Sequence, residues 1–439
     1  MFGRARMRNK ISIVLDTVRV FTAWLHLRVR IGATRVRASN SRFLLFFAWG
    51  FPPTSGGGVH RPASIAKYAA RSGWRVSVVA SPLDEAPSAP GLELLQSLPA
   101  TIAVSRAEAP LASYRMLPKV DGGFANMIAA VRTARAACGQ ERPSVVLVSG
   151  PPFMIFISAY MIARQIGAPL VLDYRDEWTV HTPGWISASA FDRHWERKVL
   201  QFSSAAIFVT ELMRQRYLES IPGLAADKCL VIPNGWDPDD FARVASMTPR
   251  KHVEPQRFVI SFIGSSVHYS SPGAFLAQFA RVIEHRPALR DQLVLRFIGR
   301  KVSAMEKELL AFQNRLPGSI ELVDEVPKAD AVARMCGADA LLFLLDSFYD
   351  HAIPGKLYEY LASGTPILAI GETGLAAELV RRLGAGPVVA ADNPSSLEAA
   401  IDLLLREPRE RWNTPARVAW LESHTRGALA TRVLQVLDD

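Results

Sequence analysis

The chain has 439 residues, which suggests two or three domains, and 49% hydrophobic with 21% charged residues is ordinary for a globular enzyme. The formal net charge is +10, but residues 1–40 carry nine basic residues and one acid, so the remaining residues are nearly neutral. The high charge is therefore no argument for nucleic acid, and we predict no nucleic-acid partner. The three cysteines form no C-x-x-C pair, which disfavours a zinc site or a disulfide framework and fits a reducing, cytoplasmic compartment.

Residues 1–40 form a basic, apolar arm. A segment of this kind can lie on an anionic membrane surface. Asp16, Arg19 and His26 interrupt the apolar run, so no membrane span is predicted, and a signal peptide is disfavoured because a cleavage site is lacking. We predict a peripheral position on the inner face of the cytoplasmic membrane. The alternatives are a disordered leader and unrelated residues added by an upstream start codon.

Short apolar segments alternate with helical stretches in the rest of the chain, as is typical of parallel sheets built from βαβ units. The first set of predicted strands is Phe43–Ala48, Arg75–Ala80, Ser144–Val148, Leu170–Asp173, Ala205–Val209 and Cys229–Ile232. The second set is Phe258–Ile263, Leu293–Ile298, Ile320–Val323, Ala340–Leu344, Pro366–Ile370 and Pro387–Ala390. The apolar run from Pro152 to Leu172 is broken by polar residues, glycine and proline, and it predicts a buried helix followed by a strand.

Two such sets predict an α/β protein with two doubly wound parallel-sheet domains. The predicted parts are the arm (1–40), an N-terminal domain (41–236), a linker (237–256), a C-terminal domain (257–410) and a helical segment (411–439). In doubly wound sheets a ligand binds beyond the carboxyl ends of the strands. The candidate functional residues are therefore sought in the loops that follow the strands.

The loop after the first strand contains Gly56, Gly57 and Gly58. Three consecutive glycines let a backbone approach a ligand closely and expose its N–H groups. The loop does not match the dinucleotide fingerprint, because Arg61 stands where the third glycine belongs, and it lacks the P-loop lysine and hydroxyl. A flexible turn is the alternative interpretation.

The segment Asp173–Thr179 closes the fourth strand with three acids, a base and two aromatic residues. The functional interpretation places Asp173, Arg175 or Asp176 near sugar or acceptor hydroxyls, with His181 as a proton-transfer group. The structural alternatives are an Asp–Arg pair that holds the loop and a histidine without a chemical role.

In the second domain, Gly264, Ser265 and Ser266 follow the first strand and offer N–H and hydroxyl donors to a phosphate. Arg300 follows the next strand, where a guanidinium can pair with phosphate oxygens.

The segment Ile353–Ile370 predicts a loop, a helix and a buried strand. Pro354 and Gly355 mark the helix start. Lys356 and Glu359 are three residues apart on one face of the first turn. A helix N-terminus attracts anions, the lysine adds charge for a phosphate, and the carboxylate can accept from sugar hydroxyls. This combination suits a nucleotide-sugar better than a metal or a bare phosphate.

These motifs resemble, in their order and spacing, the family-4 retaining glycosyltransferases with the GT-B fold, especially bacterial members that build surface polysaccharides. The resemblance covers about residues 42–410 and rests on Gly56–Gly58, Asp173–Thr179, Ile232–Asp237, Gly264, Gly299 and Lys356–Pro366. It implies two Rossmann-like domains facing across a cleft. The second would bind a UDP- or GDP-sugar donor and the first a glycan or lipid-linked acceptor, with a C-terminal helix crossing back to the first domain.

By this resemblance Glu359 would contact the ribose hydroxyls, and Lys356 and the Gly264–Ser266 backbone would face the diphosphate. Leu357 and Arg300 complete the predicted donor-binding residues. The acceptor side would comprise Gly56, Gly57, Gly58 and Arg175, and the catalytic candidates are Asp173, Asp176, His181 and His351.

Two positions depart from the family pattern. His351 stands where the first of two glutamates eight residues apart is often found, and Ser265 stands where many members have an arginine. We expect Lys356 and Arg300 to supply the missing charge.

The sequence therefore predicts a retaining hexosyltransferase for polysaccharide or cell-envelope glycan synthesis, with no cofactor and no metal. The Asp237-Pro-Asp239 pattern is disfavoured as a cation site because a hard cation needs further oxygen ligands. The alternatives are a nucleotide-sugar epimerase or hydrolase of the same fold and a non-catalytic partner protein.

Overall fold

The computed structural model describes residues 37–38, 42–83, 86–108, 123–182, 188–245, 257–264, 271–344, 346–390 and 392–438. The chain divides into two compact units, one made of Met1–Pro233 with Ala430–Asp439 and the other of Asn234–Leu429. The chain thus passes from the first unit to the second after Pro233 and returns after Leu429. The predicted membrane-binding arm lies almost entirely outside the described residues.

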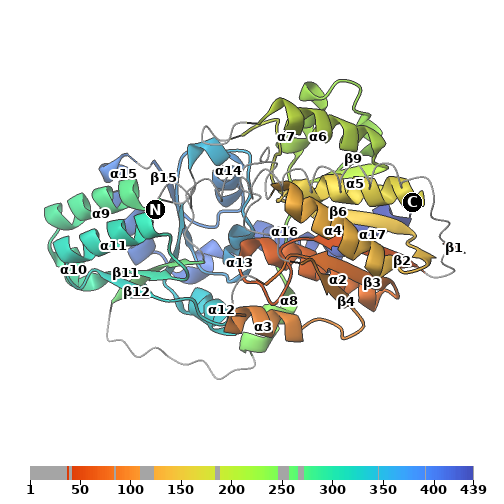
Figure 1. Ribbon diagram of the computed structural model, residues 1–439. Coiled ribbons are helices and arrows are strands. Elements are labelled where there is room, and N and C mark those ends of the chain that lie inside the picture. The colour runs from red at the N-terminus through yellow and green to blue at the C-terminus, as the bar shows by residue number, and fades with distance from the viewer. Residues whose placement is uncertain are drawn as a thin grey trace, which may run out of the picture. The chain divides into compact units, whose positions relative to one another are not determined.

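The first unit contains a sheet of seven strands in the order β4-β3-β2-β6-β7-β8-β9, all paired in parallel (Figure 1). A second, two-stranded sheet pairs β1 (Arg37–Ala38) with β5 (Glu141–Arg142). The strands of the large sheet are β2 (Phe43–Ala48), β3 (Arg75–Ala80), β4 (Ala103–Arg106), β6 (Val145–Gly150), β7 (Leu170–Tyr174), β8 (Ala205–Phe208) and β9 (Cys229–Val231).

The second unit contains a sheet of six strands in the order β12-β11-β10-β13-β14-β15, again all parallel. The chain starts in the middle of each large sheet, moves outward and then reverses, which is the doubly wound Rossmann order. The strands are β10 (Phe258–Ile263), β11 (Leu293–Ile298), β12 (Ile320–Val323), β13 (Ala340–Leu344), β14 (Ile367–Ile370) and β15 (Val388–Val389).

All twelve predicted strands are present, with ends that differ by at most two residues. The predicted helix and strand within Pro152–Leu172 are also confirmed as α5 (Met154–Ile166) and β7. Helix α5 ends at Gly167, whose positive φ of 67° a glycine adopts without strain.

Three other helices of the first unit, α3 (Ala89–Gln96), α6 (Ala190–Phe202) and α7 (Glu211–Ser220), begin at residues whose side chains accept a hydrogen bond from the first turn. Ser189 and Asp192 form a reciprocal capping box, and Thr210 accepts from the backbone of Met213. The unit also contains α2 (His60–Arg71) and α4 (Gly123–Cys138), with short 3₁₀ turns at Gly57–Val59 and Ala226–Lys228.

The second unit begins with α8 (Pro238–Ala245), which lies inside the predicted linker and packs on α12. The remaining helices are α9 (Gly273–His285), α10 (Ala288–Gln292), α11 (Ser303–Arg315), α12 (Lys328–Gly337), α13 (Gly355–Ala362), α14 (Leu375–Arg382), α15 (Pro394–Arg406), α16 (Pro415–Ser423) and α17 (Arg426–Asp438). Short 3₁₀ turns lie at Ser347–Tyr349 and Arg409–Trp412. The chain returns to the first unit within α17.

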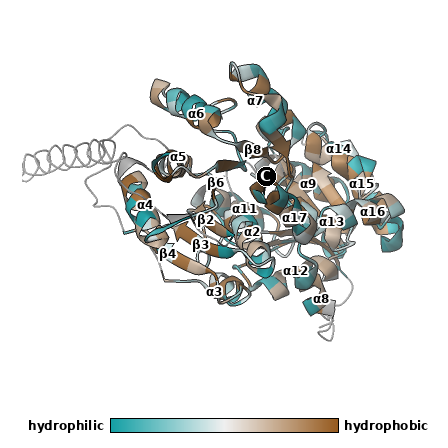
Figure 2. Cartoon of the chain, turned by 90° about the vertical axis from the view of Figure 1, so that its right-hand side faces the viewer, coloured by the Kyte–Doolittle hydropathy of each residue, from teal (hydrophilic) through white to brown (hydrophobic). Residues whose placement is uncertain are grey.

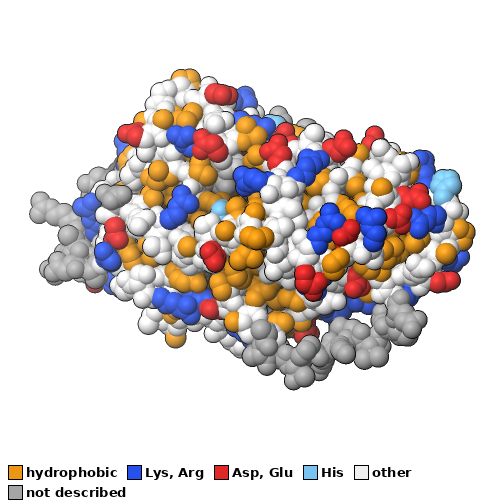
Figure 3. Space-filling model, turned by 180° about the vertical axis from the view of Figure 1, so that it is seen from behind, with side chains coloured by type: hydrophobic (Ala, Val, Ile, Leu, Met, Phe, Trp, Pro, Cys, Tyr) orange, Lys and Arg blue, Asp and Glu red, His pale blue; other side chains and the backbone are white. Residues whose placement is uncertain are grey.

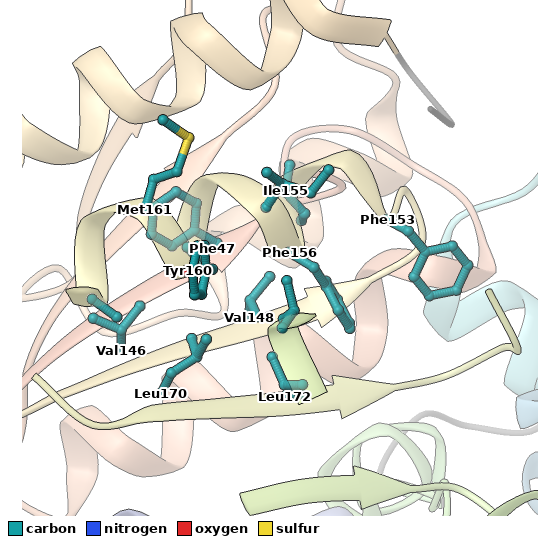
Figure 4. Packing of buried hydrophobic residues seen from close by; sticks show 14 of the residues in the cluster. Phe47, Val146, Val148, Phe153, Ile155, Phe156, Tyr160, Met161, Leu170 and Leu172 are labelled. Atoms are coloured by element: carbon teal, nitrogen blue, oxygen red, sulfur yellow. The ribbon is translucent and has the colours of Figure 1, made fainter. Parts of the chain in front are cut away.

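One large hydrophobic cluster of the first unit lies between its large sheet and helices that include α4, α5, α6 and α7. Figure 4 shows Ile155 and Phe156 of α5 above Val146 and Val148 of β6, with Leu172 of β7 beside them. Each of these side chains is fully buried. The Phe153 ring stacks on Trp178 at 5.4 Å, so the segment that follows β7 is packed against the start of α5.

In the second unit, helices cover both faces of the sheet. Leu342 and Leu344 of β13 belong to a hydrophobic cluster with α9, α11 and α15, whereas Leu341 and Phe343 belong to another with α13 and α14. Successive side chains of a strand point to opposite faces, which explains why a parallel strand buried on both sides reads as a continuous apolar run.

The elements of the fold differ in hydropathy. In Figure 2, strands such as β2 and β3 are largely brown while much of α7 is teal. Figure 3 shows acidic and basic side chains interspersed with apolar ones on one face. None of the helices in the described parts of the chain is long and apolar enough to cross a lipid bilayer.

Candidate active site

The strand order of each large sheet reverses between its two central strands, at β2 and β6 in the first unit and at β10 and β13 in the second. Ligands of doubly wound sheets bind at the carboxyl ends of these strands, because the connections there diverge to opposite faces. The predicted loop Gly56–Gly58 follows β2 and the predicted residue Gly264 follows β10, so both lie at this end of their sheets.

In the second unit, Gly264 and Gly299 directly follow β10 and β11, with φ angles of 129° and 123°. A Cβ at Gly299 would lie only 2.5 Å from the carbonyl oxygen of Gly264, so the two strand ends can approach this closely only with glycine. The predicted residues Ser265 and Ser266 lie outside the described residues.

Lys356 lies in the first turn of α13. Its ammonium nitrogen is buried and has no hydrogen-bond partner among the described residues. It lies 4.1 Å from the centroid of the Phe262 ring, a cation–π contact. A Cβ at Gly264 would be 3.8 Å from its Cε, which places the lysine at the end of β10. Burial lowers the pKa of Lys356 to about 8.

Tyr360 fixes α13 against the same strand end. Its hydroxyl donates to the carbonyl of Ile263 at 3.0 Å and accepts from the amide of Ile263 at 2.7 Å. The hydroxyl thus both donates and accepts a hydrogen bond, and it attaches the helix to the residue that precedes Gly264. Lys356, one turn earlier on the same helix, is held in place by this attachment.

Glu359, predicted to contact a ribose, is buried and ion-paired. Its Oε1 accepts from Arg426 Nη2 at 2.9 Å and from the ammonium of Lys328. Asp240 of α8 lies next to this pair, 3.7 Å from Arg426 Nη1. Burial raises the pKa of Asp240, against the opposing effect of Lys328 and Arg426. The ribose assignment for Glu359 stays a prediction.

The other predicted donor residues are distributed differently. The side chain of Leu357 is fully buried in the hydrophobic cluster of α13, so any contact of this residue with a ligand would be made by its backbone. Arg300 is exposed, one residue after Gly299. His351 is buried beside the rings of Phe348 and Tyr349, with Nδ1 3.4 Å from an oxygen of Asp350. A catalytic role for His351 stays a prediction.

In the first unit the structure brings Arg175 and the glycine loop together. The guanidinium donates to the carbonyls of Gly58, Gly150 and Pro151, with 3.1 Å for the bond from Nε to Gly150. A Cβ at Gly58 would lie 2.9 Å from Arg175 Nη1. Burial lowers the pKa of Arg175. Arg175 therefore joins two strand-end loops through their backbones, and acceptor contact through Gly56, Gly57 or Gly58 stays a prediction.

Asp173, at the end of β7, is fully buried. Its carboxylate accepts from Arg61 Nη2 and from Ser149 Oγ, both at 2.7 Å. Arg61 also donates to the carbonyls of Ile232 and Pro233, just before the chain leaves the first unit. This geometry matches the structural alternative of an Asp–Arg pair, although the partner is Arg61 instead of Arg175.

The segment after β7, which carries the exposed Asp176 and the half-buried His181, is attached to α6 and α7. Glu196 of α6 is fully buried and accepts from Tyr217 Oη at 2.7 Å and from the hydroxyl of Thr179. The amide of Trp178 donates to the same Tyr217 oxygen at 2.9 Å. Burial raises the pKa of Glu196 to about 7, and nearby Asp192 acts in the same direction.

This raised pKa predicts a pH-dependent stability. Between pH about 4.5 and about 7 the native state keeps the Glu196 proton that the unfolded state loses, so the free energy of unfolding falls as pH rises. The loss is up to roughly 3 kcal/mol. Glu196→Gln removes the titration, so in urea denaturation its stability relative to wild type should improve from pH 5 to pH 8. The matched control is Glu219→Gln, at an exposed position of α7, which should follow the wild-type profile. Parallel profiles for wild type and Glu196→Gln would contradict the expected titration.

No three His, Cys, Asp or Glu side chains of the described residues come together as they would around a metal ion. The Asp-x-Asp pattern lies at the start of α8, where Asp237 Oδ1 accepts from the backbone of Asp239 at 3.1 Å. Asp240 is engaged with Arg426, as described above. That the protein works without a metal or cofactor stays a prediction.

Several residues described above for the two units were not predicted from the sequence. Arg61 was noted only for not being glycine, and Lys328, Arg426, Ser149 and Glu196 were not considered. Arg61 and Asp173 are 112 residues apart, and Arg426 and Glu359 are 67 apart. No local pattern links positions that far apart, so a single sequence carries no signal for these pairs.

Comparison with family models finds two matches. Residues 56–235 match the glycosyl transferase 4-like domain, and residues 248–418 match the glycosyl transferases group 1. The curated proteins provide no match in sequence.

Solved structures are similar over most of the chain. Anabaena HepE, solved in complex with UDP-glucose, is 14% identical with a TM-score of 0.64 over 90% of this chain and 99% of its own. WaaG, a glycosyltransferase involved in lipopolysaccharide biosynthesis, gives the same four values. Sucrose-phosphate synthase from Thermosynechococcus elongatus is 13% identical with a TM-score of 0.64, over 90% of this chain and 98% of its own.

The fold of two Rossmann-like parallel sheets is thus the one predicted. Because the two family models follow one another along most of the chain, they identify the kind of enzyme as well. The chain belongs to the family-4, group 1 glycosyltransferases of the GT-B fold.

Proposed function

We propose that the protein transfers a sugar from a nucleotide-sugar, with a UDP- or GDP-linked donor, to a glycan acceptor. The observation that carries the proposal is the buried ammonium of Lys356, which has no hydrogen-bond partner among the described residues and lies at the carboxyl end of β10. A buried charge is costly unless it is compensated, so such a group is best explained by an anionic ligand. The diphosphate of the donor is an anion of suitable charge.

Breaking the bond between the sugar and the diphosphate puts negative charge on the leaving phosphate, while the sugar becomes oxocarbenium-like. A fixed cation at the leaving oxygens stabilises this state more than the ground state. Lys356 is held in place by α13, which Tyr360 attaches to β10. The first-turn N–H groups of α13 add a further positive field. We propose that these groups neutralise the leaving group without a metal.

The finer parts of the proposal rest on the motif resemblance. They are transfer of a hexosyl group with retention of configuration, a lipid-linked acceptor, a role in polysaccharide or cell-envelope glycan synthesis, and peripheral binding of residues 1–40 to an anionic membrane. Among the similar structures, WaaG is described as acting in lipopolysaccharide biosynthesis, which supports the acceptor class.

The proposal is tested first by donor binding. UDP-glucose, GDP-mannose, ADP-glucose and dTDP-glucose are each added to the purified protein, and the melting temperature is measured. A donor at 100 times its Kd should stabilise the fold by about 2.7 kcal/mol, which is a shift of several degrees. Absence of a shift with all four nucleotide-sugars would overturn the proposal.

A second measurement separates the alternatives. The radiolabelled form of the stabilising donor is incubated with the protein, with and without a bacterial membrane extract. Transfer of label to lipid or glycan should require the extract. An epimerase or hydrolase would convert the donor without it, and a non-catalytic partner protein would do neither.

A further inference from the structure

The two chain segments that connect the units are joined to each other. The chain enters the second unit at Asn234 and leaves it after Leu429. Trp236 and Thr425 form a parallel β-bridge, in which the amide of Trp236 donates to His424 at 3.2 Å and the amide of Arg426 donates to Trp236 at 2.7 Å. The indole of Trp236 also donates to the carbonyl of Leu421 at 2.9 Å. We call residues 235–236 with 424–426 the joint.

The joint is tightly packed. A Cβ at Gly235 would lie 2.6 Å from the carbonyl oxygen of His424 and 2.7 Å from a methyl of Leu429. The ring of His424 stacks on Trp420 at 3.9 Å, and Trp420 stacks on Tyr358 of α13 at 5.3 Å. The helix that carries Lys356 and Glu359 is therefore in contact with the returning segment of the joint.

Arg426 connects the joint to Glu359 directly. Its Nε donates to the carbonyl of Gly235 at 3.1 Å, and its Nη2 donates to Glu359 Oε1 at 2.9 Å. The side chains of Arg426 and Glu359 are each only 11% exposed, so water screens the pair little. The planar guanidinium makes both bonds in one fixed orientation, which a lysine cannot do.

The surroundings of the pair are balanced in charge. Lys328 donates to the same carboxylate oxygen, and Asp240 lies 3.7 Å from Arg426 Nη1. Loss of Arg426 would leave Lys328 to neutralise Glu359. The carboxylate would then keep a partner but lose the constraint that fixes it relative to the joint.

We propose that Arg426 is a positioning residue for the donor, which holds the Glu359 carboxylate in one orientation and ties it to both segments that connect the units. This inference rests on the proposed function, in which Glu359 contacts the donor ribose. The Arg426 guanidinium bonds both the Glu359 carboxylate and the Gly235 carbonyl, so donor binding at Glu359 is coupled to the conformation of the joint. Because such coupling is reciprocal, the conformation of the joint also affects the affinity for the donor.

The test uses Arg426→Gln and Arg426→Lys in the full-length protein. With the nucleotide-sugar that stabilises wild type most in the four-donor screen, Arg426→Gln should raise KM at least tenfold and change kcat less than threefold. Arg426→Lys should raise KM less than Arg426→Gln does, because lysine keeps the positive charge but cannot make both guanidinium hydrogen bonds. A merely structural role would lower the active fraction, and hence the apparent kcat, without moving KM.

Arg432→Gln is the matched control. Arg432 lies on the same helix and donates to the carbonyl of Val231 at 2.7 Å. The substitution therefore removes an arginine hydrogen bond to a backbone carbonyl and leaves the Glu359 carboxylate unaffected. Its KM should equal that of wild type. In a double-mutant cycle, Glu359→Gln combined with Arg426→Gln should be no weaker in donor binding than Glu359→Gln alone.

The outcomes separate two failures. If wild type binds none of the four donors, the proposed function itself fails. If wild type binds a donor and Arg426→Gln retains the wild-type KM, or if the two substitutions simply add in the cycle, the positioning role is overturned while the proposed function stands.

Discussion

Lys356→Met is expected to abolish nucleotide-sugar binding and at the same time to raise the melting temperature of the ligand-free protein. The binding loss follows from removal of the cation proposed to face the diphosphate. The gain in stability follows because the charged ammonium is buried without a hydrogen-bond partner among the described residues. Methionine has a similar length and adds no charge that must be desolvated.

The pKa of Lys356 gives the sign and the pH range of this gain. The pKa of about 8 lies below its usual value of 10.5, so the unfolded state binds the extra proton between these two values. Burial of the charged lysine therefore costs stability at pH 7, by up to roughly 3 kcal/mol, and the cost disappears as pH rises through about 10.5. The melting temperatures of Lys356→Met and wild type should accordingly converge at high pH.

The measurement combines thermal shifts of the ligand-free and donor-saturated proteins at pH 7 and at high pH. Lys307→Met is the control, because Lys307 is exposed on α11 in the same unit. It should change neither quantity. A Lys356→Met protein that binds the donor with wild-type affinity would remove the main support for the proposed function.

Asp173→Asn is expected to destabilise the first unit by about 3–5 kcal/mol. The substitution replaces the carboxylate that pairs with the largely buried Arg61 guanidinium by a neutral amide, so the positive charge is no longer compensated. Arg61 also holds the carbonyls of Ile232 and Pro233, so the last segment of the unit should loosen as well. Removal of both charges by Arg61→Met with Asp173→Leu should cost less than the sum of the single substitutions, since no uncompensated ion remains.

The loss of stability is measured by urea denaturation, with hydrogen exchange of the β7 and β9 amides as the probe of the first unit. Glu219→Gln, at an exposed position of α7, should change the free energy of unfolding by no more than about 0.5 kcal/mol. A loss of activity by Asp173→Asn without any loss of stability would instead support the predicted catalytic role of Asp173.

The strands could be predicted because most are buried on both faces. Segments such as Phe43–Ala48 and Ala340–Leu344 are unbroken apolar runs, and they match the structure residue for residue. The edge strand β4 (Ala103–Arg106) was missed, because its Ala-Val-Ser-Arg sequence is short, half-exposed and has no apolar run. A strand that is buried on both faces needs apolar residues at successive positions, whereas an edge strand does not.

The site was predictable where it depends on local sequence. The start of α13 after Pro354 and the position of Lys356 on its first turn follow from neighbouring residues. The isolation of the Lys356 ammonium above Phe262 does not, because it depends on a strand more than ninety residues earlier. The pairing of Glu359 with Arg426 and of Asp173 with Arg61 has the same origin. These contacts exist only once the sheet has brought distant strand ends together.

The order of the two units along the chain has a consequence for protein engineering. The second unit is one uninterrupted segment, Asn234–Leu429, whereas the first is completed by Ala430–Asp439 from the far end of the sequence. In that tail Val433, Leu434 and Leu437 are buried. A fragment cut at the first passage between the units would therefore lack part of its own hydrophobic interior. Exchange of whole domains between related enzymes needs two splice points in the sequence, because the second unit is an insertion within the first.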